Sequence, residues 1–219
     1  MSPELRLYED VLTNDGEVSL PAQPRMIFVV HGSLVTANYS VRDGETLSGE
    51  GAVNLKAGGG GVTYWRWELV SGEAAASVAA GHGVMSRGKL TARLETLPAG
   101  RLLLRGDSVA FPPGGCAYLH RHQGPGIRCL VEGGIRIDTH GRSTSYGVGG
   151  AWYETGPDPV FAQAAMDRPS RFIRVMILPR ALAGKSSIQY LNEDDKAKPK
   201  TQSYKIYADA PISFDAARK

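Results

Sequence analysis

Short apolar segments recur along the chain, and turns rich in glycine and proline separate them. The segments are four to seven residues long, a length typical of β-strands rather than of amphipathic helices. The breaks draw on 27 glycines and 13 prolines. The clearest segments are residues 26–30, 62–67, 101–104, 127–131 and 172–178. The sequence therefore predicts an all-β protein, and only the alanine-rich stretch from Gly72 to Met85 suggests a helix or linker.

The two halves of the chain share a weak internal repeat. Residues 28–34 read like residues 129–135, and Arg66 and Arg174 lie in similar apolar segments. Both pairs are about 100 residues apart and keep the same order, which indicates two copies of one β module. We expect the two arginines to close their modules with ion pairs.

Three regions follow from this reading. We expect an amino-terminal barrel over residues 1–85, a carboxy-terminal barrel over 86–185 and an extension over 186–219. The extension alternates well near residues 202–207, so it could add a strand that covers a sheet edge or crosses to a partner chain.

Composition excludes several classes of protein. Of the 219 residues, 42% are hydrophobic and 21% are charged, as in ordinary globular proteins. The net charge of +3 is too small and scattered to indicate nucleic-acid binding. No signal peptide or membrane span is apparent, so we expect a cytoplasmic protein that binds no membrane. Cys116 and Cys129 fit two small buried thiols, with a ligand or redox pair as the alternative.

The candidate chemistry centres on His120 and His122, which a single arginine separates. Alternate residues of a strand project to the same face, so the two imidazoles would lie side by side. Neutral imidazole is a common ligand of Zn, Fe, Ni, Mn and Cu. The pattern therefore favours a metal site, and the alternative is a pair of solvent-facing histidines.

The region around these histidines resembles the cupin superfamily. Gly114, His120, His122 and Gly133 match the first cupin motif, and residues 149–161 are similar to the second. The resemblance covers about residues 101–179, and the internal repeat extends it to the amino-terminal half. It implies a bicupin, in which two tandem jelly-roll β-barrels with little helix form one chain and a metal is held inside one end of a barrel.

Two of the four usual cupin ligands are missing. Gly126 stands where the motif has glutamate, and Phe161 or Ala162 stands where it has a third histidine. Glu154 or Gln163 could instead supply an oxygen ligand, and Gln123 is a weaker candidate. We expect one divalent metal (Fe, Zn, Mn or Ni), with a degenerate pocket that no longer binds metal tightly as the alternative.

The repeat places Ser19 and Pro21 at the positions of the two histidines in the amino-terminal half. Neither residue ligates metal well, so we expect that barrel to be structural and without metal.

Substrate-binding residues are expected on the same inward face as the histidines. Arg128 would lie next to the metal, either as a clamp for a carboxylate or as the ion-pair partner of Glu154. Aromatic side chains would surround the pocket and favour a small organic ligand, although core packing is the alternative for each of them. They are Trp152, Tyr153, Tyr118 and Phe161.

Two classes of function remain open at this stage. The first is a metal-dependent enzyme in which Arg128 orients a small anionic substrate and Glu154 or Tyr153 handles a proton. Resemblance to cupins allows dioxygenase, isomerase, decarboxylase or lyase chemistry, and two histidines with one carboxylate favour a dioxygenase. The second is a non-catalytic bicupin that binds or senses a small molecule. We expect a homodimer in either case.

Overall fold

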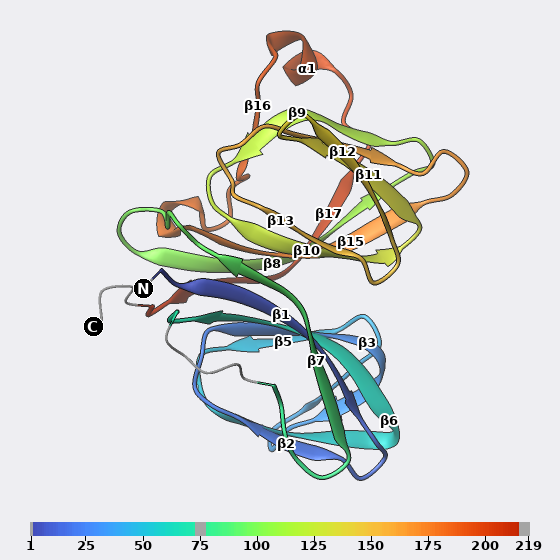
Figure 1. The fold of residues 1–219 in the computed structure, drawn as a ribbon, viewed down its shortest axis with the longest axis vertical. Coiled ribbons are helices and arrows are strands. Elements are labelled where there is room, and N and C mark those ends of the chain that lie inside the picture. Colours follow the sequence, from blue (N-terminus) through green and yellow to red (C-terminus); the bar gives the residue numbers. More distant parts are fainter. Residues whose placement is uncertain (1, 73–77, 215–219) are drawn as a thin grey trace. The chain divides into compact units, whose positions relative to one another are not determined.

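The chain divides into two compact units. One comprises Met1–Glu95 with Ile212–Lys219, and the other comprises Thr96–Pro211. The computed structural model describes residues 2–72 and 78–214 (Figure 1). Strands dominate the described residues of both units and form jelly-roll-like sheets, which confirms the predicted all-β class. No helix among the described residues is long and apolar enough to cross a membrane.

The first unit is built on one sheet of seven strands. Its path runs β4-β3-β6-β1-β7, while β2 pairs with β6 and β5 pairs with β3. The strands are β1 (Glu4–Leu12), β2 (Glu17–Leu20), β3 (Arg25–Val35), β4 (Ser40–Arg42), β5 (Thr46–Gly49), β6 (Val53–Val70) and β7 (Val84–Arg93). Of the stretch from Gly72 to Met85, residues 73–77 lie outside the described residues, and residues 78–83 form neither helix nor strand.

Charged side chains occupy part of the interior of the first unit. Arg66 donates to Asp10 (Nε to Oδ2, 2.7 Å) and contacts Glu68 (Nη1 to Oε2, 2.6 Å), and Arg25 donates to Glu68 at 3.0 Å. All four residues are buried. Removing one partner of such a network leaves an uncompensated charge, which usually costs about 3–5 kcal/mol.

The second unit consists of two five-stranded sheets that face each other (Figure 1). One has the order β13-β10-β15-β8-β17 and the other β12-β11-β14-β9-β16. The elements are β8 (Leu102–Phe111), β9 (Cys116–His122), β10 (Gly126–Glu132), β11 (Gly134–Thr139), β12 (Arg142–Gly147), β13 (Ala151–Glu154), β14 (Val160–Ala164), β15 (Ser170–Pro179), the 3-10 turn η1 (Arg180–Leu182), β16 (Ile188–Tyr190), α1 (Glu193–Ala197) and β17 (Ser203–Ile212).

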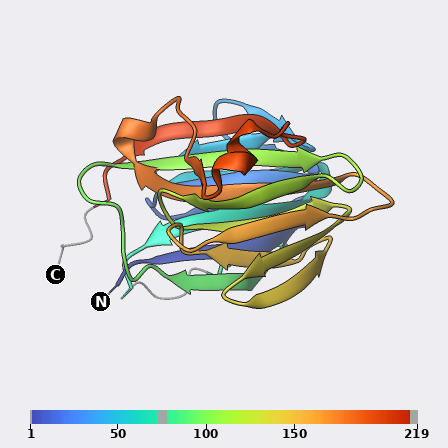
Figure 2. The same cartoon turned by 90° about the horizontal axis from the view of Figure 1, so that it is seen from above.

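Apolar side chains of both sheets meet inside this second unit. Phe111, Leu130 and Trp152 come from one sheet, and Ile137 and Ala162 come from the other. The short helix α1 lies outside the sheet that contains β9 (Figure 2). The interior beside β9 is therefore enclosed by sheet on both sides.

The same strand order recurs in the two units. The series β7-β1-β6-β3 corresponds to β17-β8-β15-β10, and each series carries an arginine-aspartate pair between equivalent strands. Arg66 binds Asp10 between β6 and β1, and Arg174 binds Asp107 between β15 and β8. The recurrence follows the repeat seen in the sequence.

The borders between regions differ from the expected ones. The expected border after residue 85 falls at the beginning of β7, whereas the two units separate after Glu95. The reason is that β7 pairs along β1 and so belongs to the first sheet. The expected extension over residues 186–219 supplies β16 and β17, which are edge strands of the two sheets of the second unit.

Candidate metal centre

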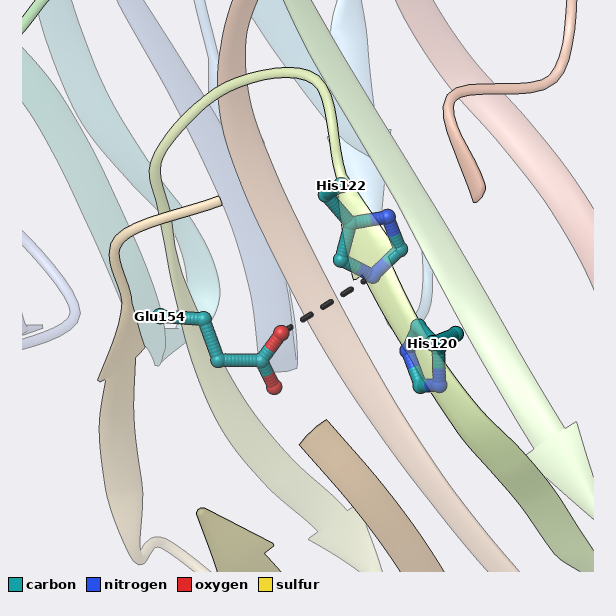
Figure 3. A group of neighbouring side chains, drawn as sticks. All are labelled: His120, His122 and Glu154. Carbon is teal, nitrogen blue, oxygen red and sulfur yellow. Dashed lines mark ion pairs between the residues drawn. The ribbon is translucent and has the colours of Figure 1, made fainter. Parts of the chain in front are cut away.

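His120 and His122 lie side by side on β9 and point into the second unit (Figure 3). Their ring centroids are 4.9 Å apart, and both residues are buried. The strand is held on both edges, because Val160 of β14 and Tyr190 of β16 pair with His120 from opposite sides. The alternative of two solvent-facing histidines is therefore wrong.

Glu154 reaches the two histidines from the facing sheet (Figure 3). Its Oε2 is 3.8 Å from Nε2 of His122, and one ligand atom from each of the three residues lies within 4.8 Å of the others. The indole Nε1 of Trp152 donates to Glu154 Oε1 at 2.9 Å and so orients the carboxylate. The three side chains form a buried group with two nitrogen ligands and one oxygen ligand.

The glycine at position 126 explains why the carboxylate comes from another strand. A Cβ atom on Gly126 would lie 2.5 Å from the carbonyl oxygen of Val175 and 2.7 Å from Cγ of Met176, so no larger side chain fits there. Gly126 pairs with Glu154 in the ladder between β10 and β13. The carboxylate therefore enters the site from the position directly across the ladder.

Burial keeps both imidazoles neutral, which is the form that binds metal. Burial lowers the pKa of His120 below its usual value. The pKa of His122 is lowered further, because burial and the nearby guanidinium groups of Arg174 and Arg128 all disfavour its charged form. Nδ1 of His120 lies 2.7 Å from the carbonyl oxygen of Tyr118, an arrangement that leaves Nε2 as the ligand atom.

Arg128 is the ion-pair partner of Glu154, one of the two roles that the sequence left open for it. Its Nη2 is 2.7 Å from Glu154 Oε2, and its Nη1 donates to the carbonyl oxygen of Gly126 at 2.6 Å. Burial lowers its pKa to about 10, so it remains charged at neutral pH. Arg174, on the adjacent strand, binds Asp107 with two hydrogen bonds and places Nη1 3.4 Å from Nε2 of His122.

The donor set fits a divalent metal. Two imidazoles and a carboxylate are a common set for Zn and non-haem Fe, and carboxylate oxygen also suits Mn. The cavity between them has a volume of about 20 Å³, enough for one ion or one water molecule. Glu154 is shared with Arg128, so an ion that binds this carboxylate competes with the guanidinium.

Four of the expected site residues lie outside this cavity. Strand alternation turns Tyr153 away from Trp152 and Glu154, and it turns Phe161 and Gln163 away from Ala162. The amide of Gln163 donates to the carbonyl oxygens of Gly114 and Gly115, at 2.7 and 3.2 Å. Phe161 instead lies 6.0 Å from the guanidinium carbon of Arg136.

Tyr118 is displaced by a local irregularity in β9. The ladder between β14 and β9 shifts register, so that Ala117 and His120 face the cavity while Tyr118 does not. Its ring instead lies against the ammonium groups of Lys198 and Lys200, 4.9 and 5.5 Å from its centroid. Alternation counted back from His120 does not anticipate such a shift.

Other residues of the site were not predicted from the sequence. Arg174 was expected only as an ion-pair residue, yet it also contacts His122. A signal existed, because an arginine inside the apolar run 172–178 is unusual unless its charge is compensated. Ser187 and Tyr204 also line the region of the two histidines, and their positions depend on how the tail folds back.

Comparisons with known proteins identify the fold. A scan against models of known protein families finds no match, and a search of curated proteins finds none. The oxalate decarboxylase of Lactobacillus farciminis, solved as a formate complex, matches with a TM-score of 0.64 and 12% identity over 89% of this chain and 82% of its own.

Two further structures agree with this result. The oxalate decarboxylase of Bacillus subtilis, described with Mn(II) centres, has a TM-score of 0.60 and 12% identity over 91% of this chain and 81% of its own. AerE from Microcystis aeruginosa has a TM-score of 0.57 and 12% identity over 81% of this chain and 93% of its own. At such low identity the likeness shows the fold alone, a jelly-roll-like arrangement of β-sheets.

Proposed function

We propose that this protein is a bicupin whose carboxy-terminal barrel binds one divalent metal and acts on a small organic acid. The observation that carries the proposal is the buried convergence of His120, His122 and Glu154, with ligand atoms within 4.8 Å of one another. When bound, the ion would supply Lewis acidity towards a carboxylate and, if it is redox-active, electron transfer. Oxidation by dioxygen is the reaction we place first, because this ligand set is typical of Fe(II) oxygenases.

The residues of the chain have separate roles in this proposal. His120 and His122 would hold the ion through ring nitrogens, and both rings are neutral at physiological pH because burial lowers their pKa values. Glu154 balances part of its charge, and Trp152 fixes the orientation of that carboxylate. Decarboxylation, the activity named for two of the structural neighbours, is the alternative reaction, and it uses the same kind of substrate.

A second function is favoured by the contact between Arg128 and Glu154. Because this pair lies at 2.7 Å in the buried site, the carboxylate already has a compensating charge without any metal. In this alternative the barrel binds or senses a small molecule and catalyses nothing.

Metal content separates the two functions. Protein purified without chelator is analysed for Fe, Mn, Ni and Zn, and the double variant His120→Ala, His122→Ala is analysed beside it. About one ion per chain, lost in the double variant, supports the metal-dependent enzyme. His31→Ala is the matched control, since this histidine is 86% exposed and far from the site in sequence. A wild-type protein that takes up no added metal would contradict the metal-dependent enzyme and favour the non-catalytic binding module.

We further propose that the protein acts in the cytoplasm as a homodimer. Cys116 and Cys129 form no disulfide in the described part of the chain, which fits a reducing compartment. The mass of the particle in solution, measured by light scattering, tests the dimer: about twice 23.5 kDa supports it.

A further inference from the structure

A second cavity adjoins the three candidate metal ligands within the carboxy-terminal unit. Its volume is about 180 Å³, and it lies between β8, β15, β17 and the segment of residues 184–188. His122 and Arg174 border this cavity and also the smaller one around the ligands. A molecule in the larger cavity would therefore be next to the ligands.

The sizes of the two cavities decide where an organic molecule can sit. The cavity around His120, His122 and Glu154 measures about 20 Å³, so it holds an ion or a water molecule and no more. The neighbouring cavity, at about 180 Å³, has room for a compact organic acid. A substrate that approaches the ligands must therefore occupy this second space.

Positive charge dominates the lining of the larger cavity. Arg105 and Arg174 are compensated, because they bind Asp209 and Asp107 respectively. Lys185, whose side chain is exposed, stands at the border of the cavity, and no ion pair joins its ammonium group to a carboxylate of the described residues. The loop at the border of the cavity therefore carries one exposed cation that is not paired with any carboxylate in the described part of the chain.

The loop that presents Lys185 is fixed by hydrogen bonds. Arg105 donates through Nη1 to the carbonyl oxygen of Lys185 at 2.6 Å and through Nη2 to that of Leu182 at 2.7 Å. The amide of Gly184 donates to Asp209 Oδ2 at 2.6 Å. Because the backbone is already held, binding a ligand there would order few additional groups.

Polar side chains on the other walls complement a carboxylate. The hydroxyl of Ser187 lies 3.4 Å from Nδ1 of His122, and the ring of Tyr204 forms the wall on β17. Nη1 of Arg174, the nitrogen not used by Asp107, faces the border between the two cavities. Hydroxyl and guanidinium donors thus line one space, and the exposed Lys185 stands at its border.

We propose that the 180 Å³ cavity is the binding subsite for a small organic carboxylate, with Lys185 as its main cationic partner. Binding of the carboxylate at this subsite requires no metal. Only its role as a substrate site rests on the proposed function. Neutral molecules of the same size are discriminated against by the uncompensated charge of Lys185.

Calorimetric titration of metal-free protein with succinate tests the subsite, and succinamide serves as the uncharged probe of the same shape. We expect succinate to bind and succinamide to bind at least tenfold more weakly. Lys185→Gln should weaken succinate binding about tenfold, the effect of one lost charged contact, and Lys185→Glu should weaken it further. Lys205→Gln removes the same charge from the opposite face of β17, so it should change the affinity less than twofold.

Titration of the same variants with Mn²⁺ separates this proposal from the proposed function. Succinate binding that is lost in Lys185→Gln supports the subsite even if the protein binds no Mn²⁺, a result that would overturn only the metal-dependent function. No succinate binding, or equal losses in Lys185→Gln and Lys205→Gln, would overturn the subsite, while uptake of one Mn²⁺ per chain would leave the metal-dependent function standing.

Discussion

Replacing Arg128 by methionine should tighten metal binding. Methionine keeps much of the length and apolar contact of the side chain but removes the guanidinium that lies 2.7 Å from Glu154. In the wild-type protein an ion must compete with this guanidinium for the carboxylate and then share a buried site with its charge. In the variant neither obstacle exists.

Both effects are large enough to measure. A unit charge and a divalent ion about 5 Å apart repel each other by about 7 kcal/mol at an effective dielectric constant of about 20. Disrupting a buried ion pair costs about 3–5 kcal/mol on its own. Movement of Arg128 relieves part of this repulsion, so we expect a net gain of about 2.7 kcal/mol, or a dissociation constant about 100-fold lower.

The assay is a competitive titration of chelator-treated protein with Mn²⁺ and Zn²⁺. Arg121→Met is the control, because Arg121 alternates with the two histidines on β9, is exposed and carries the same charge. Since Glu154 loses its partner, metal-free Arg128→Met should also be about 3–5 kcal/mol less stable, and Arg128→Lys, which keeps the charge, serves if the first variant does not fold. The idea that Arg128 competes with the metal would be refuted if Arg128→Met bound metal no more tightly than the wild-type protein and Arg128→Lys bound it with the same affinity as Arg128→Met.

Three further predictions concern stability. The pKa of His122 is lower in the folded protein than its unfolded value of about 6.5, so as the pH falls the unfolded state binds the proton first. The metal-free protein should therefore have its full stability above about pH 6.5. Below that pH, urea unfolding curves should show a loss of up to about 1.4 kcal/mol per pH unit. Asp10→Ala should lower the unfolding free energy by about 3–5 kcal/mol, because the buried Arg66 and Arg25 would then share the single carboxylate of Glu68. Gly126→Ala should lower the melting temperature by several degrees, since its Cβ would meet Val175 at 2.5 Å.

Each of these has a matched comparison. The pH dependence should be shallower in His122→Asn, and an unchanged slope would assign it to other groups. Glu17→Gln breaks the ion pair with Lys56, whose two side chains are both more than 60% exposed, so it should change the unfolding free energy by less than about 0.5 kcal/mol. An effect as large as that of Asp10→Ala would show that burial does not determine the cost of breaking an ion pair. Gly147→Ala, where a Cβ meets nothing within 4 Å, should be close to neutral.

The sequence predicted the fold class because strand periodicity is a local property. The five apolar segments fall in β3, β6, β8, β10 and β15, with only Arg101 lying outside its strand. The pairing of His120 with His122 is equally local, since two residues on one strand share a face. Glu154 was found because an acid at the end of an apolar segment is uncommon and the usual glutamate position is a glycine.

The positions of the other site residues depend on how strands pair and on how the tail folds back, which the sequence of a single strand does not determine. Tyr118 was misplaced because a register shift in one ladder changes which residues face inward. Tyr153 and Gln163 were chosen by proximity in sequence, although their neighbours occupy the inner face. The contribution of Ser187 could not be foreseen, because it requires the chain to return past β9 after β15 has ended.

The pairing of Gly126 with Glu154 has a consequence for how such sites are recognised. Two residues that pair across an antiparallel ladder project to the same face, so a ligand atom can reach one point in space from either of the two strands. In this protein β13 carries the acid at Glu154, while β10 carries glycine at position 126, where Val175 and Met176 leave no room for a larger side chain. A motif that fixes the acid to one strand therefore misses this site, whereas a motif that includes the paired position across the ladder would find it.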